Sequence, residues 1–208
     1  MVDTQTLRVQ KTARYFTIGE LNNQTEEVWL VLHGYAQLAA NFILPFEVLD
    51  NGKRLIVAPE GLNKFYAKGF GGQPAANWMT SEDRENEIAD YVFYLDALTD
   101  RLKIPTNVKL VLFGFSQGVA TASRWLHHTQ YTISRFIIYA GEIALELKNP
   151  IAKKLVTTPL TYVTGNKDKL ISNEKLTEVK QLMSQLKATE IVFEGGHEVK
   201  EDVLLQLQ

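Results

Sequence analysis

The sequence predicts an α/β fold with a mostly parallel central sheet and helices on both of its faces. Short apolar runs that indicate buried strands alternate with segments of helical periodicity, an alternation that is typical of parallel sheets. Most of the apolar runs end near a glycine. Nothing in the 208 residues, of which 45% are hydrophobic, requires a division into two domains. We therefore expect one domain over residues 1–208.

Six apolar or β-branched runs are the predicted strands of the sheet. They cover residues 28–32, 54–58, 109–113, 136–139, 160–164 and 190–193. The range 7–18 leaves room for one or two antiparallel strands at an edge.

Helical periodicity appears between these runs. The clearest helix has apolar residues at helical spacing, namely Ile88, Val92, Leu95, Leu98 and Leu102. Thr80 and Ser81 are its candidate N-caps, and Pro105 stops it because proline lacks the amide hydrogen of a helix interior. A second helix is expected over 176–186 and a short one near 203–207.

Charge and composition exclude several classes of function. The formal net charge is −2 and no block of Lys or Arg is present, so a nucleic-acid partner is not expected. The chain has no cysteine, which excludes disulfides and thiolate metal sites. No stretch approaches the ~20 apolar residues of a membrane span, and the first residues lack the apolar core of a signal peptide. We therefore expect a soluble, cytoplasmic protein.

A serine, an aspartate and a histidine follow three of the predicted strands. Ser116 comes after 109–113, Asp168 after 160–164 and His197 after 190–193. The carboxyl ends of parallel strands meet at one edge of a sheet, where ligands bind. We therefore expect these three side chains to lie close together, in the chain order Ser, Asp, His.

The segment GFSQG explains why Ser116 stands where it does. A G-x-S-x-G sequence between a strand and a helix turns the chain sharply and exposes the hydroxyl, and Gly114 and Gly118 leave the backbone room for the turn. A serine becomes a nucleophile when a histidine takes its proton and a carboxylate orients that histidine. The alternative is a glycine-flanked turn with a bystander serine.

The choice of the acid depends on placement. Asp168 and His197, each taken alone, could be ordinary loop residues. Glu60 and Glu142 follow the wrong strands for the usual layout of a Ser-Asp-His order, and Glu194 lies only three residues before the histidine. Asp168 is therefore the predicted acid.

The segment HGYAQ, residues 33–37, is predicted to supply a hydrogen-bond donor to the reaction intermediate. The oxyanion of a tetrahedral intermediate requires backbone N–H donors that are already in place. We expect the amides of Tyr35 and Gln117 to be these donors. His33 has no metal-ligand partner nearby, which favours a structural, hydrogen-bonded histidine.

Several motifs together resemble a known family. LHGYAQ, APEG, ANW, GFSQG, GNKD and GGHEV look like the carboxylesterase/phospholipase family of α/β-hydrolases, which includes acyl-protein thioesterases. The resemblance runs from about residue 28 to residue 197. It implies the α/β-hydrolase fold and cofactor-free hydrolysis of ester or thioester bonds by Ser116, Asp168 and His197, with Tyr35 and Gln117 at the oxyanion hole. The chain departs from many members at Ala36-Gln37 and at Val119.

The range 61–79 is the predicted substrate-binding loop, because a long connection without clear secondary structure is unusual in a compact domain. The candidate substrate-binding residues are Phe65, Tyr66, Phe70 and Trp78 in this range and Glu142 at the rim. An equal alternative is that the aromatic residues pin the loop to the core.

The expected substrate is a small-molecule or lipid ester, without cofactor or metal, since no Walker motif, H-E-x-x-H or ligand cluster is present. Two other functions stay open. One is a catalytically silent binding protein on the hydrolase fold. The other is a related enzyme such as a dienelactone hydrolase or an acyltransferase. The sequence does not indicate the acyl chain, the leaving group or the oligomeric state.

Overall fold

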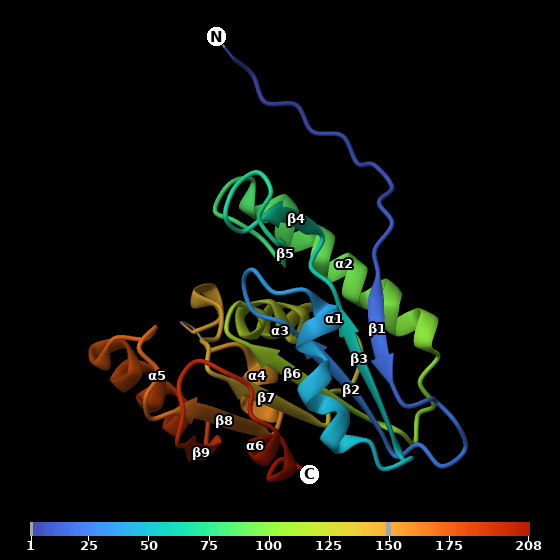
Figure 1. Ribbon diagram of the computed structural model, residues 1–208, viewed down its shortest axis with the longest axis vertical. Coiled ribbons are helices and arrows are strands. Elements are labelled where there is room, and N and C mark those ends of the chain that lie inside the picture. Colours follow the sequence, from blue (N-terminus) through green and yellow to red (C-terminus); the bar gives the residue numbers. More distant parts are fainter. Residues whose placement is uncertain (1, 149–150) are drawn as a thin grey trace.

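The computed structural model describes residues 2–148 and 151–208 (Figure 1). Within these residues seven strands form the central sheet, in the order β1-β3-β2-β6-β7-β8-β9. The strands are β1 (Tyr15–Ile18), β2 (Glu27–Leu32), β3 (Arg54–Pro59), β6 (Lys109–Phe115), β7 (Arg135–Tyr139), β8 (Leu160–Gly165) and β9 (Thr189–Phe193). β1 pairs antiparallel with β3, and the other neighbours are parallel. This confirms the six predicted strands and an antiparallel edge strand within 7–18.

Helices cover both faces of the sheet, as predicted. One face carries α2 (Arg84–Leu102), α3 (Gln117–His128), α4 (Lys153–Thr157), α5 (Asn173–Gln185) and the 3₁₀ helix η2 (Leu145–Leu147). The other carries α1 (Ala39–Phe42), the 3₁₀ helix η1 (Leu44–Leu49) and α6 (Glu201–Leu205). The sheet is therefore buried between two layers of helices (Figure 1).

β2 shows why both layers form. Side chains alternate between the two faces of a strand, and β2 is apolar at nearly every position. Val28, Leu30 and Leu32 belong to the core under α2 and α3, whereas Trp29 and Val31 belong to the core under α1 and η1. A strand with two apolar faces is stable only when helices cover both of them.

The connections diverge beside β2. The chain passes from β2 to β3 on one side and later returns as β6 on the other side. A crevice at the carboxyl ends of two such strands is where ligands bind in open α/β sheets. His33 follows β2 and Ser116 follows β6, so both lie at this position.

The range 61–79 corrects one expectation. It contains an antiparallel hairpin of β4 (Asn63–Tyr66) and β5 (Pro74–Asn77). Apart from Phe65 and Tyr66, the two strands carry few residues with high β-propensity, so the sequence gives little local signal. The hairpin is held by pairing across the turn and by a bridge between Gln37 and Ala76, which no local pattern shows.

The predicted start of α2 is also wrong. The helix begins at Arg84, and neither Thr80 nor Ser81 caps it. The Thr80 amide instead donates to the carboxylate of Glu87, at 2.5 Å. The helix ends at Leu102, before Pro105, as expected. The helices predicted over 176–186 and 203–207 are α5 and α6.

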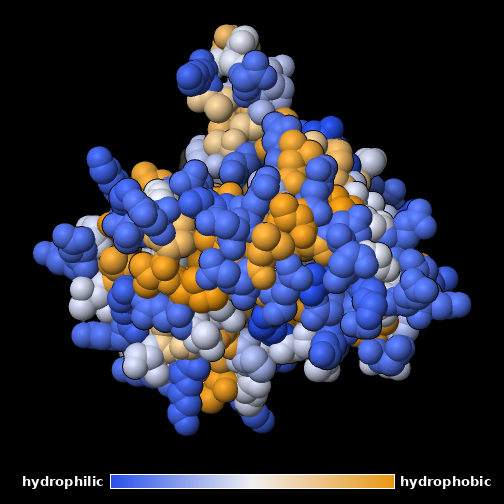
Figure 2. All heavy atoms as spheres, turned by 60° about the horizontal axis from the view of Figure 1, so that its bottom comes forward, coloured by the Kyte–Doolittle hydropathy of each residue, from blue (hydrophilic) through white to orange (hydrophobic). Residues whose placement is uncertain are grey.

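The surface mixes hydrophilic and hydrophobic residues. Figure 2 brings forward the lower part of the molecule as drawn in Figure 1, where hydrophilic residues predominate and hydrophobic residues form groups between them. None of the helices in residues 2–148 and 151–208 is both long and apolar enough to cross a lipid bilayer.

Candidate active site

Ser116 occupies a strained turn between β6 and α3. Its backbone angles are φ 52° and ψ −120°, a conformation that costs about 1–3 kcal/mol for a residue other than glycine. The Ser116 amide donates to the Tyr139 carbonyl at 3.0 Å, and the Ser116 carbonyl accepts from Val119 at 3.0 Å. The strain is therefore held by β7 on one side and by the first turn of α3 on the other.

Two glycines make this turn sterically possible. A Cβ atom on Gly114 would lie 2.7 Å from the Gly118 carbonyl oxygen. A Cβ atom on Gly118 would lie 2.7 Å from the His33 carbonyl oxygen, and closer still to that of Leu32. The start of α3 therefore packs directly on the backbone at the end of β2, as the G-x-S-x-G pattern predicts.

Gly141 is a third glycine that this turn requires, and the sequence pattern alone did not predict it. A Cβ atom on Gly141 would lie 2.5 Å from the Ser116 carbonyl oxygen and 2.6 Å from a methyl group of Val119. Its only sequence signal is a glycine two residues after the β7 strand, which by itself does not identify a contact with Ser116.

The structure brings Asp168 and His197 together. His197 Nδ1 and Asp168 Oδ2 are 2.7 Å apart, and the other oxygen of Asp168 accepts from the Leu170 amide at 2.9 Å. The Asp168 side chain is 3% exposed and that of His197 is 19% exposed. The carboxylate is thus shielded from water, while the imidazole keeps an open side.

His197 also lies beside the turn that carries Ser116. Its ring centroid is 4.9 Å from that of Phe115, the residue before the serine. Ser116 itself is half-buried, and among the described residues no hydrogen bond joins its Oγ to the imidazole. Such contacts are often long without substrate and tighten only in the reacting complex.

Two free amides lie next to Ser116. In the described part of the chain, the backbone N–H groups of Tyr35 and Gln117 donate no hydrogen bond. The segments that carry them are in contact, because a Cβ atom on Gly34 would lie 3.1 Å from Ser116 Cβ. The Gly34 amide donates to Gln37 Oε1 at 2.7 Å, which leaves the Tyr35 amide as the available donor of this turn.

His33 is a structural histidine, as expected. It is fully buried, its Nε2 accepts from the Gly61 amide at 2.9 Å, and its Nδ1 lies 2.7 Å from the Gly34 carbonyl. These partners fix the neutral tautomer with the proton on Nδ1. Burial lowers the pKa of His33 to about 4, against small opposing effects of the Gly34 carbonyl and Glu60.

Trp78 and Gln117 connect the hairpin to the active site. Gln117 Oε1 accepts from the Trp78 amide at 3.2 Å, and Gln117 Nε2 donates to the Met79 carbonyl at 2.9 Å. The Trp78 indole donates to the His33 carbonyl at 2.8 Å and is 1% exposed. This placement favours the alternative in which Trp78 pins the hairpin to the core over its prediction as a substrate-binding residue.

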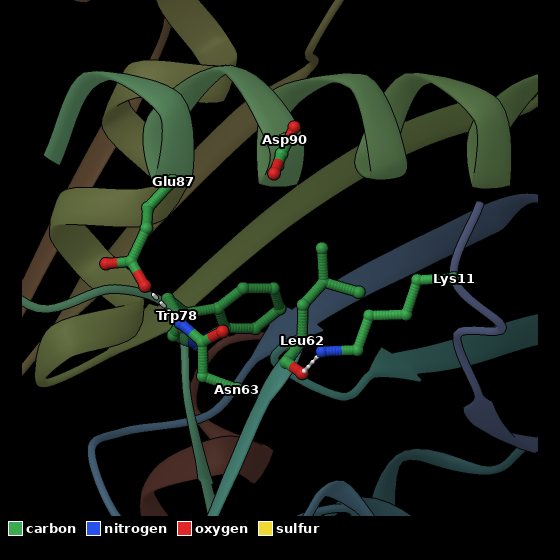
Figure 3. A pocket seen from close by; sticks show the side chains of 6 residues that line it. All are labelled: Lys11, Leu62, Asn63, Trp78, Glu87 and Asp90. Carbon is green, nitrogen blue, oxygen red and sulfur yellow. Dashed lines mark hydrogen bonds between the residues drawn. The ribbon is translucent and has the colours of Figure 1, made fainter. Parts of the chain in front are cut away.

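A small pocket borders Trp78 on its outer side (Figure 3). Its volume is about 70 Å³, and it is lined by Lys11, Leu62, Asn63, Trp78, Glu87 and Asp90. Lys11 donates to the Leu62 carbonyl at 2.6 Å, and the Asn63 amide group donates to Glu87 at 2.6 Å. A pocket of this volume has room for only a few water molecules and includes no member of the predicted triad, so it is not the substrate site.

The other predicted substrate-binding residues lie at different depths. The half-buried Phe65 ring is 5.3 Å from the Tyr35 ring, next to the free Tyr35 amide. Tyr66 is 55% exposed and Phe70, near the tip of the hairpin, is fully exposed. Of these three residues, Phe65 is the one with a ring contact to the oxyanion-hole segment. Substrate contact by these residues stays a prediction.

Other carboxylates near the strand ends are paired with cations. The pairs are Glu60 with Arg14 (2.6 Å), Glu142 with Lys148 (2.8 Å) and Glu194 with Lys167 (2.7 Å). Glu142 is thus held by Lys148, and its contact with substrate stays a prediction. In residues 2–148 and 151–208 no three His, Cys, Asp or Glu side chains are grouped as a metal site.

Comparisons with known proteins show which fold the chain shares. The structure of acyl-protein thioesterase 2 from Zea mays matches 94% of this chain and 96% of its own, with a TM-score of 0.72 and 18% sequence identity. A phospholipase/carboxylesterase from Dyadobacter fermentans matches 96% of each chain, with a TM-score of 0.64 and 17% identity. A Bacillus cereus carboxylesterase matches 94% of this chain and 91% of its own, with a TM-score of 0.65 and 16% identity. A search of curated protein sequences finds no match.

The family comparison covers most of the chain. The model of the family described as serine hydrolase (FSH1) matches residues 51–202, a range that includes Ser116, Asp168 and His197. The match confirms the prediction of a serine hydrolase, and the structural likeness confirms the α/β-hydrolase fold. The chain belongs to the FSH1 serine hydrolase family.

Proposed function

We propose that the protein is a carboxylesterase that cleaves carboxylic ester or thioester bonds through an acyl-enzyme on Ser116. The observation that carries the proposal is the 2.7 Å hydrogen bond between His197 and Asp168 at the edge of the sheet that also carries the strained Ser116 turn. A nucleophile, a base and a buried acid at one edge are the parts that this chemistry needs.

In the proposed reaction, Ser116 Oγ attacks the carbonyl carbon while His197 Nε2 takes the hydroxyl proton. The tetrahedral intermediate places its negative oxygen at the amides of Tyr35 and Gln117, each worth about 3 kcal/mol or more of transition-state stabilisation. Collapse breaks the bond to the alcohol or thiol, which leaves with the proton from His197. Water, deprotonated by His197, then hydrolyses the acyl-enzyme and restores Ser116.

Asp168 is the proposed acid because its neighbours suit that role. It keeps the His197 Nδ1 proton in place and stabilises the imidazolium that forms when Nε2 takes the serine proton. Glu60, Glu142 and Glu194 are each paired with Arg14 or a lysine instead. Their carboxylates are therefore already compensated by a cation.

Replacement of the nucleophile and the acid tests the proposal. We expect Ser116→Ala to remove hydrolysis of p-nitrophenyl acetate and labelling by a fluorophosphonate, with an unchanged melting profile. Asp168→Asn should lower kcat by about 10²–10⁴-fold, since the imidazole loses its tautomer control. Glu142→Gln is the matched control and should keep kcat within a few-fold of wild type.

The result that contradicts this assignment is specific. If Asp168→Asn keeps more than about a tenth of kcat/KM, a difference below ~1.4 kcal/mol, while Glu142→Gln abolishes it, then Asp168 is not the acid. Esters from acetate to palmitate, a thioester and a lysophospholipid, assayed side by side, would define the substrate class. One similar structure is named an acyl-protein thioesterase, which is the reason to include the thioester.

A further inference from the structure

A second cavity lies behind the segment that carries Asp168. Its volume is about 230 Å³, and it opens to solvent between α5, the carboxyl ends of β8 and β9, and the connection from β8 to α5, with Val192 52% exposed. We call it the α5 cavity; the residues that line it include Thr164, Asn166, Ile171, Asn173, Leu176 and Val192. Asp168 also lines it, whereas Ser116 and His197 do not, so the cavity adjoins the proposed catalytic site on the side of its acid.

One of the residues that line the α5 cavity, Thr164, has a buried hydroxyl group. Thr164 is 3% exposed, and its Oγ1 makes no hydrogen bond with any described residue. Side chains alternate along β8: Leu160 and Tyr162 face the core under α5, and Val163 faces the opposite core. Thr164 therefore points to the α5 side, where the cavity lies.

A second buried hydroxyl stands next to it. Burial raises the pKa of Tyr162, and the neighbouring Thr164 hydroxyl opposes that shift, yet Tyr162 OH also lacks a partner with hydrogen-bond geometry. Two hydroxyls carry two donors, and a bond between them would use only one. One O–H group of the pair therefore still needs an acceptor, because a buried unpaired donor is costly, and of the two residues Thr164 is the one that lines the cavity.

The charges at the cavity are already compensated. Lys180 pairs with Glu190 at 2.6 Å, and Asp168 bonds His197 and the Leu170 amide. An ionised ligand would find no free counter-charge here, whereas a neutral ligand has no such requirement. Ile171, Leu176 and Val192 add apolar side chains to the lining.

We propose that the α5 cavity binds a small uncharged alcohol, with its hydroxyl at Thr164 and its apolar part between Leu176 and Val192. A cavity of about 150 Å³ suffices for benzene, so one of about 230 Å³ has room for an aromatic ring with a hydroxymethyl group. The proposal concerns binding alone and does not depend on hydrolysis at Ser116.

Benzyl alcohol is the probe. Toluene is the matched ligand that lacks the hydroxyl, and benzoate is the matched ligand that carries a charge. Each is titrated into the full-length protein and followed through backbone amide chemical shifts. We expect saturable shifts at Thr164, Leu176 and Val192 with benzyl alcohol, at millimolar concentrations because the ligand is small. Benzoate should produce none at these positions.

Thr164→Val removes the hydroxyl and keeps the shape of the side chain. One hydrogen bond predicts a 3- to 10-fold loss of affinity for benzyl alcohol and an unchanged affinity for toluene. Thr161→Val is the matched control, since Thr161 is buried on the opposite face of β8, and it should leave both affinities unchanged.

Leu176→Trp fills the α5 cavity and should abolish binding of both neutral ligands. It also serves as the second variant if Thr164→Val does not fold. The proposal is overturned if wild-type protein shows no saturable shifts at the cavity, if toluene binds as tightly as benzyl alcohol, or if a folded Thr164→Val binds the alcohol unchanged.

Discussion

The two halves of the proposed catalytic edge are built in different ways. Around Ser116, three glycines from separate segments bring backbone against backbone, and an added methyl group at Gly114, Gly118 or Gly141 would overlap backbone atoms of another turn. Around His197, the loops after β8 and β9 touch through Gly165 and are joined by the Asp168 side chain. A cavity of about 230 Å³ lies behind that second half.

This difference suggests what each half contributes. The nucleophile needs a strained backbone, and a strained backbone persists only where surrounding contacts leave it no alternative. The base needs an oriented ring, and a buried carboxylate at 2.7 Å supplies that orientation. In this half one glycine, Gly165, packs as closely on backbone, since a Cβ atom there would lie 2.5 Å from the Gly195 and Gly196 carbonyl oxygens. The serine half has three glycines in such contacts and the histidine half has Gly165, so the serine half should be the less tolerant of substitution.

Gly118→Ala and Gly196→Ala form the strongest test of this contrast. A Cβ atom on Gly118 would lie 2.7 Å from the His33 carbonyl oxygen, whereas one on Gly196 would find its nearest neighbour at 4.0 Å. We expect Gly118→Ala to destabilise the protein by about 3 kcal/mol or more, or to prevent folding. Gly196→Ala should stay within about 0.5 kcal/mol of wild type.

Urea denaturation followed by circular dichroism measures both variants. Similar midpoints for Gly118→Ala and Gly196→Ala would show that the backbone at the end of β2 can move away from α3. The proposed rigidity of the serine half would then be wrong.

His33 makes the serine half sensitive to acid. Its pKa in the folded protein is about 4, below the 6.5 of an unperturbed histidine, so the unfolded chain binds more protons between these values. Stability is therefore complete above pH 6.5 and is lost as the pH falls toward 4. The loss is about 2 kcal/mol at pH 5 and approaches about 3 kcal/mol below pH 4, at ~1.4 kcal/mol for each pKa unit.

Stability measured at pH 7.5 and at pH 5 tests this prediction with His33→Gln and His128→Gln. His128 is the matched control because burial also lowers its pKa, although its side chain is on the surface. We expect His33→Gln to remove most of the loss at pH 5 and His128→Gln to retain it. The reverse result would assign the acid sensitivity to the end of α3.

Local sequence patterns account for the features of the fold and of the candidate site that the sequence could predict. The six strands are short apolar runs, and the turn at Ser116 is encoded by glycines two residues before and after it. The order Ser, Asp, His along the chain was enough to predict that Asp168 and His197 would meet. These features depend on residues near one another in sequence or on the general rule that strand ends share an edge.

Long-range contacts account for the features of the structure that the sequence could not predict. The contact of Gly141 with Ser116 and the indole bond from Trp78 to the His33 carbonyl each join separate strands. The β4–β5 hairpin is stabilised partly by its bridge to Gln37, and Glu87 of α2 accepts from the Thr80 amide outside the helix. In each case the fold determines which residue is the contact partner, so the residue type alone does not identify that partner.

The smallest expected effect separates two aromatic residues of the hairpin, and it depends on the proposed esterase activity. The Phe65 ring lies 5.3 Å from the Tyr35 ring beside the proposed oxyanion hole, whereas Phe70 is fully exposed. An aromatic contact of this kind is worth about 0.5–1.5 kcal/mol. Phe65→Ala should therefore change kcat/KM for an octanoate ester relative to acetate by about 2- to 10-fold. Phe70→Ala should leave that ratio unchanged. If Phe70→Ala shifts the ratio as much as Phe65→Ala does, the acyl chain contacts the tip of the hairpin and the substrate site extends beyond the rigid serine half.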